Sequence, residues 1–291
     1  QIAKAADAVW HSNRNGAPAA SSAGEEPPVD LAGLPKARVK FIEPMLARSA
    51  TELPNGADQW IYEVKLDGYR CLAGKDSHGV HLWSRRGNSF SKDFPDIARA
   101  CQSLPPDTVV DGEVVALDAS GRASFNLIQH RRSKASAIQL YVFDILLYKG
   151  TSLLGMELSE RRKLLAVVIA PDGASLRLSE SFDAEPAVLV RGAKELGLEA
   201  IMAKRKNSLY EPGKRSCAWV KYKLNHAEEF VIGGFTPGNP FDAIIVGHYE
   251  GENLRFVAKV RNGFVPRTRR EIFKKLEPLE QVECPFVNLP E

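Results

Sequence analysis

A lysine, a carboxylate and an arginine lie within residues 65–70, Lys-Leu-Asp-Gly-Tyr-Arg. Alternation over residues 60–67 predicts a strand that turns apolar side chains to a core and Glu63, Lys65 and Asp67 to the opposite face. A lysine held on a rigid strand beside carboxylates suits nucleophilic catalysis. An edge strand with a solvated charged face has the same pattern, so both interpretations stay open for this segment alone.

Further carboxylates occur in two later segments. Asp111 and Glu113 are two residues apart in an apolar run, which places both on one face of a predicted strand. Glu199 and Lys204 are an odd number of residues apart, so in a straight strand they would face opposite sides. We therefore expect a turn or bulge between these two residues if both serve one site.

An aromatic residue and two more lysines complete the set. Phe143 lies in an apolar strand, where plain core packing is the alternative, and Lys221 and Lys223 share a strand face. Together the segments supply a lysine nucleophile, acids for a divalent cation, a ring to stack on a base and cations for phosphates. Nucleotidyl transfer needs all four. The lysine must lose its proton to attack, which neighbouring cations and a bound metal favour.

The elements that must position these residues fall into two regions. Mixed helix and strand signals between residues 38 and 226 predict an α+β domain of sheets flanked by helices. We expect strands at 80–84, 108–117 and 139–147, and helices at 94–104, from Ser159 as N-cap, and at 185–197. Residues 1–37 are rich in Gly, Ala, Ser and Pro and are predicted to be a linker.

Closely spaced strands follow from residue 227 to the end of the chain. The patterns predict strands at 229–235, 243–249 and 254–260, a hairpin turn at 250–253 and a basic helix at 267–276. Short strands with Gly-rich turns favour a small β-barrel such as an OB-fold. Residues 227–291 are accordingly expected to be a second domain.

Composition narrows the class of protein. The 291 residues are 44% hydrophobic and 26% charged, with no apolar run of membrane-spanning length. Four scattered cysteines (Cys71, Cys101, Cys217 and Cys284) show no metal-ligand spacing and favour a reducing cytosol. The net charge is only +3, but residues 201–223 contain seven Lys and Arg against one acid. This cluster predicts a phosphate-binding surface, with a solvated positive face as the alternative.

Six motifs occur in the order and approximate spacing of the covalent nucleotidyltransferase superfamily. They are Lys65-x-Asp67-Gly68-x-Arg70, Ser84-Arg85-x-Gly87, Asp111-Gly112-Glu113, Phe143-Asp144, Glu199-x4-Lys204 and Trp219-x-Lys221-x-Lys223. From about residue 38 the chain resembles ATP-dependent DNA ligases, above all the ligase portion of bacterial ligase D, which acts in end joining. The resemblance implies an adenylation domain followed by an OB-fold domain that this sequence truncates.

The resemblance also implies roles in holding the nucleotide. Lys65 is expected to carry AMP as a phosphoramidate, Glu63 to contact the adenine and Phe143 to stack on it. Arg70 and Arg85 are expected to bind ribose, phosphate or the 5′-phosphate of a nick.

Other roles concern metal, phosphate and DNA. Glu113 is expected to contact the ribose or a metal, Glu199 to bind the divalent ion, and Lys221 and Lys223 to hold the α-phosphate. Four basic residues are candidates for nucleic-acid contacts: Arg85, Lys204, Arg205 and Arg215. Ala200 stands where the family has Gly, which matters if that backbone needs a positive φ.

The implied function is sealing of nicked or broken duplex DNA with ATP and Mg²⁺ or Mn²⁺, through a lysyl-AMP intermediate. The protein is expected to be a bacterial, cytoplasmic, nucleoid-associated monomer that works with a Ku-like end-binding partner and with no membrane. The alternatives are an RNA ligase, a capping guanylyltransferase, or a non-catalytic nucleic-acid-binding scaffold. The truncated OB-fold favours the scaffold, and the intact ionisable residues favour an enzyme.

Overall fold

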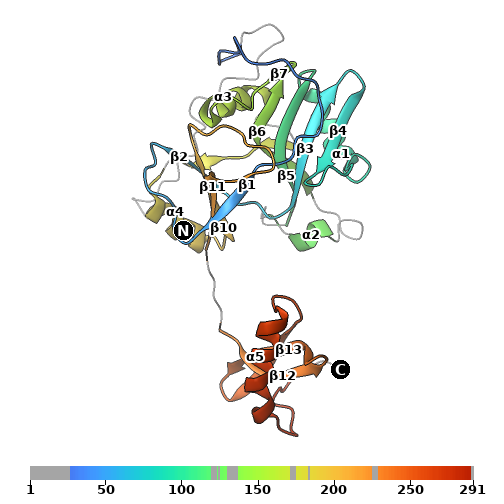
Figure 1. Ribbon diagram of the computed structural model, residues 1–291, viewed down its shortest axis with the longest axis vertical. Helices are drawn as coiled ribbons and strands as arrows, with labels where there is room; N and C mark the ends of the chain where they lie inside the picture. The colour runs from blue at the N-terminus through green and yellow to red at the C-terminus, as the bar shows by residue number, and fades with distance from the viewer. Residues whose placement is uncertain are drawn as a thin grey trace. The chain divides into compact units, whose positions relative to one another are not determined.

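The structure, a computed structural model, describes residues 27–118, 123, 125–129, 137–170, 175–182, 184–224 and 229–289. The chain divides into two compact units, residues 1–225 and residues 226–291 (Figure 1). Residues 1–26 of the predicted linker lie outside the described residues. No helix in the described ranges is long and apolar enough to cross a membrane.

One sheet of the first unit has the strand order β4-β3-β5-β6-β7. Its strands are β3 (Tyr69–Asp76), β4 (Gly79–Ser84), β5 (Thr108–Leu117), β6 (Ala137–Tyr148) and β7 (Thr151–Ser152), and β8 (Leu176–Leu178) pairs with β6 in parallel. Strands β5 and β6 are buried over most of their length, which explains why their sequences are almost continuously apolar. The predicted strands at 80–84, 108–117 and 139–147 are confirmed.

The other sheet of the first unit has the order β1-β11-β10-β2-β9. Its strands are β1 (Leu46–Ala50), β2 (Trp60–Val64), β9 (Ser181–Phe182), β10 (Ala200–Arg205) and β11 (Arg215–Lys223), antiparallel except for the β1–β11 pair. Trp60, Tyr62 and Ile201 face an apolar core, with Val220 and Tyr222 packed against it. The predicted alternation is therefore confirmed for Trp60 and Tyr62 in β2 and for Val220 and Tyr222 in β11. The predicted strand over residues 60–67 is too long, because β2 ends at Val64 and Lys65 and Asp67 lie beyond it.

Four α-helices occur among the described residues of the first unit: α1 (Pro95–Ala100), α2 (Phe125–Gln129), α3 (Leu158–Val168) and α4 (Pro186–Glu195). A 3-10 turn over Cys101–Ser103 extends α1, and α3 packs against β6. The predicted N-cap Ser159 is wrong, because the cap is Glu157 and Ser159 lies in the first turn. Gly197 follows α4 with φ +65°, as expected for a helix-ending glycine.

The described end of the predicted linker packs on the first unit. Val29 is buried in its largest apolar core, and Leu31 and Leu34 pack against it. Lys36 forms a β-bridge with Thr151 and donates from Nζ to its Oγ1 at 2.8 Å. A linker running to residue 37 is therefore not what the structure shows, since apolar burial fixes its last residues in place.

The connection between β2 and β3 depends on Gly68. A Cβ at this position would lie 2.1 Å from the carbonyl oxygen of Val114, so only glycine allows the backbones to approach so closely. Just before it, the backbone N–H of Lys65 donates to the carbonyl of Ala200 at 2.9 Å. These two contacts fix the segment that carries Lys65 between the two sheets.

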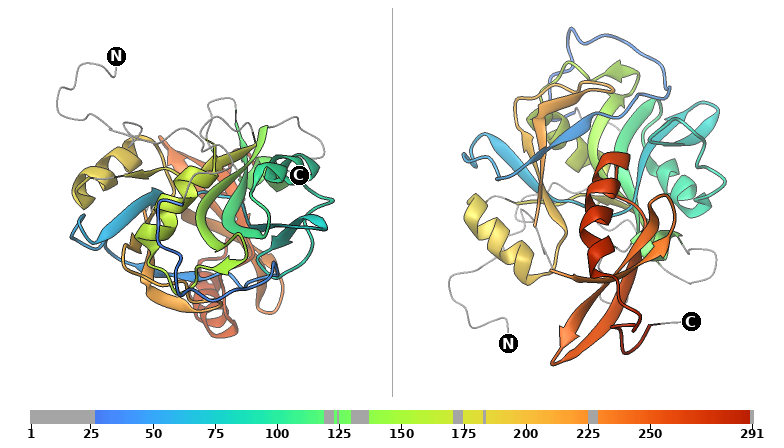
Figure 2. Two further views of the ribbon diagram at one scale, coloured as in Figure 1. Left: turned by 90° about the horizontal axis from the view of Figure 1, so that it is seen from above. Right: turned by 60° about the horizontal axis from the view of Figure 1, so that its bottom comes forward.

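The second unit contains β12 (Val231–Pro237), β13 (Phe241–Glu250), β14 (Asn253–Val260), α5 (Pro266–Leu276) and a 3-10 turn (Glu277–Leu279). The strands form an antiparallel three-stranded sheet, with Gly251 at φ +63° in the predicted hairpin turn. Helix α5, red in Figure 2, lies along this sheet and packs Phe273 against Phe235. The predicted strands and basic helix are confirmed with small shifts of their ends.

Candidate functional site

A cavity of about 690 Å³ opens in the first unit, and both of its sheets line it. This volume is typical of small-molecule sites. The predicted site residues among its lining are Glu63, Lys65, Arg70, Arg85, Glu113, Phe143, Lys204, Arg215 and Lys221. Segments far apart in the sequence thus converge on one pocket, whereas Glu199, Arg205 and Lys223 are not part of its lining.

Lys65 lies directly after β2 and lines the cavity. Its Nζ is 3.2 Å from Oε2 of Glu199, and the two side chains are 25% and 49% exposed. Glu199 precedes β10, whose pairing with both neighbours is regular. The turn or bulge predicted between Glu199 and Lys204 is therefore wrong, because Glu199 reaches Lys65 from the end of the strand.

Glu113 comes from β5 and lines the cavity. Burial raises the pKa of Glu113 to about 7, although the positive charges of Arg70 and Lys65 act in the opposite direction. Its carboxyl group consequently changes charge near neutral pH. A site that works at that pH can use such a group as a ligand or a proton acceptor.

The charge of Lys65 acts to lower the pKa of Glu113, and Lys65 also forms an ion pair with Glu199, so both glutamates lie near this lysine. No group of three or more His, Cys, Asp or Glu side chains placed to hold a metal occurs among the residues that the structure describes. Mg²⁺ is commonly held by one or two carboxylates together with substrate phosphates. The two glutamates fit an ion shared with a substrate.

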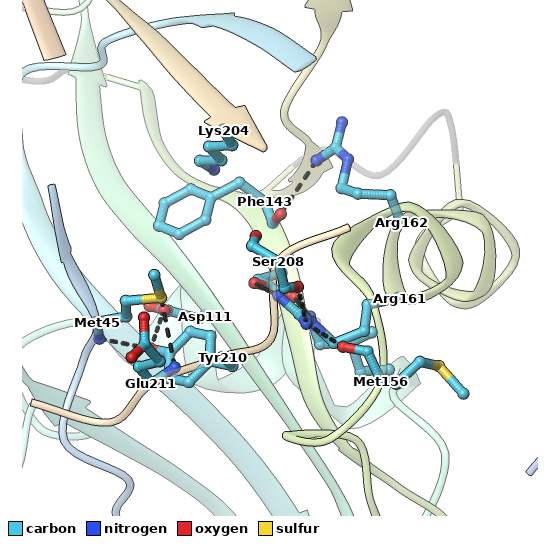
Figure 3. A network of polar contacts seen from close by, with 12 residues as sticks. Met45, Asp111, Phe143, Met156, Arg161, Arg162, Lys204, Ser208, Tyr210 and Glu211 are labelled. Atoms are coloured by element: carbon cyan, nitrogen blue, oxygen red, sulfur yellow. Dashed lines mark hydrogen bonds and ion pairs between the residues drawn. The ribbon is translucent and has the colours of Figure 1, made fainter. Parts of the chain in front are cut away.

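Arg70 is held by a buried network beside the cavity. Its Nε and Nη2 each donate to a carboxylate oxygen of Asp111 at 2.6 Å. The Tyr210 hydroxyl also donates to Asp111, at 2.7 Å, and accepts from the backbone N–H of Met45 at 3.0 Å. Figure 3 shows Asp111, Tyr210 and Met45 gathered in this way. Arg70 is therefore oriented before any ligand arrives.

Phe143 reaches the cavity because β6 is irregular at this point. Gly112 pairs with Val142 and Asp111 with Asp144, so Phe143 is the extra residue of a bulge. A bulge re-aims a side chain. The Phe143 ring is 8% exposed, with the guanidinium carbon of Arg70 4.6 Å and Nζ of Lys204 4.1 Å from its centroid.

Lys204 is buried and paired. Its Nζ donates to Oε2 of Glu63 at 2.7 Å, and the two side chains are only 2% and 3% exposed. Burial lowers the pKa of Lys204, although the Glu63 carboxylate opposes this shift. The prediction that Lys204 contacts nucleic acid is wrong, because its ammonium group is already bound inside the protein.

The other basic residues take different positions. Lys221 lines the cavity, whereas Lys223 is exposed at the end of β11. Arg85 and Arg215 are exposed and line the cavity. Arg205 is exposed and lies over the ring of Trp60, 5.1 Å from its centroid. The basic cluster of residues 201–223 is thus not one surface.

Sequence reasoning missed part of the lining. Met202 lines the cavity and pairs with both Glu63 and Lys221, so it lies between them on the polar face of the sheet. The sequence could have predicted this position of Met202, because it lies two residues before Lys204 and residues two apart share a strand face. Three aromatic residues from separate elements also line the cavity without any local pattern: Tyr69, Phe90 and Phe125.

Ala200 causes no backbone strain. Among the described non-glycine residues, a positive φ occurs only at Asp107 and Lys149. Ala200 is instead the first residue of β10 and is fully buried. Its backbone conformation therefore does not require glycine.

Comparison with known proteins assigns the family. The profile described as "ATP dependent DNA ligase domain" matches residues 44–223. The chain therefore belongs to the ATP-dependent DNA ligase family. It is 34% identical over 260 residues to the multifunctional non-homologous end joining protein LigD of Mycolicibacterium smegmatis, covering 87% of this chain and 34% of that protein. It is 32% identical over 262 residues to the LigD of Pseudomonas aeruginosa, covering 86% of this chain and 31% of that protein.

The chain spans about a third of the length of these curated relatives. Among solved structures it is similar to a mycobacterial DNA ligase D complexed with ATP and MES, with a TM-score of 0.60 at 34% identity over 86% of this chain and 82% of that one. The ligase domain of Mycobacterium tuberculosis LigD gives a TM-score of 0.58 with the same identity and coverage. The chain thus contains the nucleotidyltransferase fold of these ligase domains, with mainly antiparallel sheets and flanking helices.

Proposed function

We propose that this chain is the ligase portion of an end-joining enzyme, which uses ATP to seal nicks between a 5′-phosphate and a 3′-hydroxyl in duplex DNA. The observation that carries the proposal is the position of Lys65, which lines the cavity with Glu199 3.2 Å from its Nζ. Membership of the ligase family and the name of the LigD relatives support the reaction and its place in end joining.

Lys65 performs the first step. Its ion pair with Glu199 opens, and the ammonium group gives a proton to solvent, because an ammonium group has no lone pair with which to attack. Nζ then attacks the α-phosphorus of ATP, forming the N–P bond as the P–O bond to pyrophosphate breaks. An oxygen of the 5′-phosphate at the nick then attacks the same phosphorus, so that the N–P bond to Lys65 breaks and AMP is joined to the DNA end. The 3′-hydroxyl attacks the 5′-phosphorus and gives its proton to solvent, and the new phosphodiester forms as the bond to AMP breaks.

The polar wall of the cavity is proposed to bind the adenine. Oε1 of Glu63 is buried and accepts no hydrogen bond from the described residues, although Nη1 of Arg162 lies 3.5 Å from it. We assign this oxygen to the adenine amino group. Phe143 and Met202 line the cavity nearby and offer apolar contacts to the base. Arg70 and Arg85 are assigned to ribose and phosphate.

The phosphates and the metal belong to the Lys65 end of the cavity. Lys221 and Lys223 are proposed to hold the α-phosphate, with Lys223 moving in from its exposed position. Glu113 and Glu199 would hold Mg²⁺ or Mn²⁺. Such an ion, when bound, neutralises charge on the phosphate oxygens as the leaving group departs.

Duplex DNA is proposed to contact Arg85, Arg205 and Arg215 and the second unit. We assign residues 38–226 to the adenylation domain and 227–291 to an incomplete OB-fold domain, supported by the antiparallel strands of the second unit. Binding through the DNA backbone makes affinity salt-dependent and nearly independent of sequence. A Ku-like partner, a monomeric state and a bacterial, nucleoid-associated location complete the proposal.

The mass of the intact protein after incubation with ATP and Mg²⁺ tests the first step. The wild-type chain should gain one AMP and the Lys65→Ala variant none; equal gains would refute the nucleophile. Replacing ATP by GTP, or the DNA nick by an RNA nick, separates a guanylyltransferase or an RNA ligase. If no AMP is gained, sealing of a pre-adenylated DNA nick without ATP distinguishes a ligase deficient in its first step from a scaffold.

A further inference from the structure

Arg162 of α3 lies directly behind the wall of the cavity. Its Nη1 donates to the carbonyl of Phe143 at 3.2 Å and its Nη2 to the carbonyl of Ser179 at 2.7 Å. The same Nη1 is 3.5 Å from Oε1 of Glu63. Phe143, Ser179 and Glu63 all line the cavity, so one guanidinium group holds three parts of its wall.

The three partners of Arg162 come from separate segments. Glu63 is in β2 of the five-stranded sheet, Phe143 is the bulged residue of β6 in the other sheet, and Ser179 follows β8. In Figure 3, Arg162 extends from α3 to the Phe143 carbonyl, and Lys204 lies next to the Phe143 ring. The planar fork of an arginine can satisfy several acceptors at fixed angles, which a lysine cannot do.

Arg162 also lies beside the second oxygen of the Glu63 carboxylate. Oε2 of Glu63 is bound by Lys204, whereas Oε1 is buried, with Arg162 as its nearby cation. Arg162 stabilises the carboxylate in an orientation that leaves Oε1 able to accept a hydrogen bond. Without Arg162, both oxygens would compete for the single ammonium group of Lys204.

We propose that Arg162 is a positioning residue that sets base selectivity in this cavity. It fixes Oε1 of Glu63 and the backbone of Phe143, so that the cavity accepts a base with an amino group at that point. A base with a carbonyl there would place two acceptors against each other and be rejected. This inference rests on the proposed nucleotide-binding function.

Equilibrium binding to the full chain tests the inference, with ATP and inosine triphosphate as probes. Inosine carries a carbonyl where adenine has its amino group. Divalent ions are left out, so that no covalent transfer occurs. The variants are Arg162→Ala and Arg162→Lys, with Lys163→Gln as a control in the same helix, because Lys163 is paired with Glu160 on the protein surface. Thermal unfolding of each variant shows whether it is folded.

The wild-type chain should prefer ATP. Both Arg162 variants should lose about tenfold in ATP affinity, the equivalent of one charged hydrogen bond, with little change for inosine triphosphate. Lys163→Gln should retain both affinities. If Arg162→Ala does not fold, Arg162→Lys decides, because it keeps the charge and loses the fork. The inference would be overturned if folded Arg162→Lys kept the wild-type ratio of ATP affinity to inosine triphosphate affinity, whether both affinities were unchanged or both fell equally. A wild-type chain that binds neither nucleotide would refute the proposed function itself.

Discussion

Glu113 links the chemistry of the cavity to the stability of the fold. Its pKa is about 7 in the folded protein and near 4.5 in the unfolded chain. Between pH 4.5 and pH 7, the folded protein keeps a proton on Glu113 that the unfolded chain has already lost. The contribution of Glu113 to the unfolding free energy is therefore full below pH 4.5 and is lost as the pH rises through 7. We expect Glu113→Gln to match the wild type near pH 4 and to exceed its unfolding free energy by ~1–3 kcal/mol at pH 8. Urea unfolding across pH measures this, and a pH-independent difference would contradict it.

Tyr210 supports Arg70 without lining the cavity wall itself. Its hydroxyl is bonded to Asp111 and to the backbone of Met45, and all three residues are buried. Tyr210→Phe should lower the unfolding free energy by about 1–3 kcal/mol, since two buried groups each lose a partner. It should also weaken ATP binding by loosening Arg70. Tyr249→Phe, at a side chain 58% exposed, is the control and should change neither quantity.

The close approach of Gly68 to Val114 is one of the two backbone contacts that fix the segment carrying Lys65. Gly68→Ala would place Cβ 2.1 Å from the Val114 carbonyl oxygen, so the connection before β3 and the strand β5 would have to separate. We expect a loss of several kcal/mol, in the range of severe overpacking, together with loss of AMP transfer to Lys65. Gly155→Ala is the matched control, because a Cβ there meets nothing within 4 Å. Equal stability of the two variants, by thermal unfolding, would contradict this explanation.

Strand alternation predicted much of the site and failed at identifiable residues. It placed Glu63 and Lys221 on the polar face, because a two-residue period needs no knowledge of neighbouring strands. Lys65 was expected on the same strand but lies beyond its end. The bulge at Phe143 depends on pairing with β5, which local sequence does not reveal. Lys204 is buried, and its ammonium group is bound by Glu63, which lies 141 residues away in the sequence. Such partners are properties of the assembled sheet.

At the scale of the whole molecule, we expect the first unit to bind ATP and the second unit to add contacts to DNA. All cavity-lining residues belong to residues 1–225, as do three of the apolar cores. A chain ending at residue 225 should bind ATP like the full chain but bind nicked duplex more weakly and with a smaller salt dependence. The basic residues it loses from α5 are Arg267, Arg269, Arg270, Lys274 and Lys275. Titrations with ATP and with nicked DNA at several salt concentrations check this, and loss of ATP binding would contradict it.

The buried ion pair of Glu63 and Lys204, with the partly buried Arg162 beside it, also restricts how this sequence can evolve. Removing one member of a buried ion pair costs about 3–5 kcal/mol, a large part of the stability of an ordinary domain. Replacing one of these three residues alone by an uncharged residue should therefore be too destabilising to persist. Replacing the charged partners together avoids this cost. Across diverging ligases, the three positions should vary together, and any lineage that changes them must first acquire stability elsewhere in the fold.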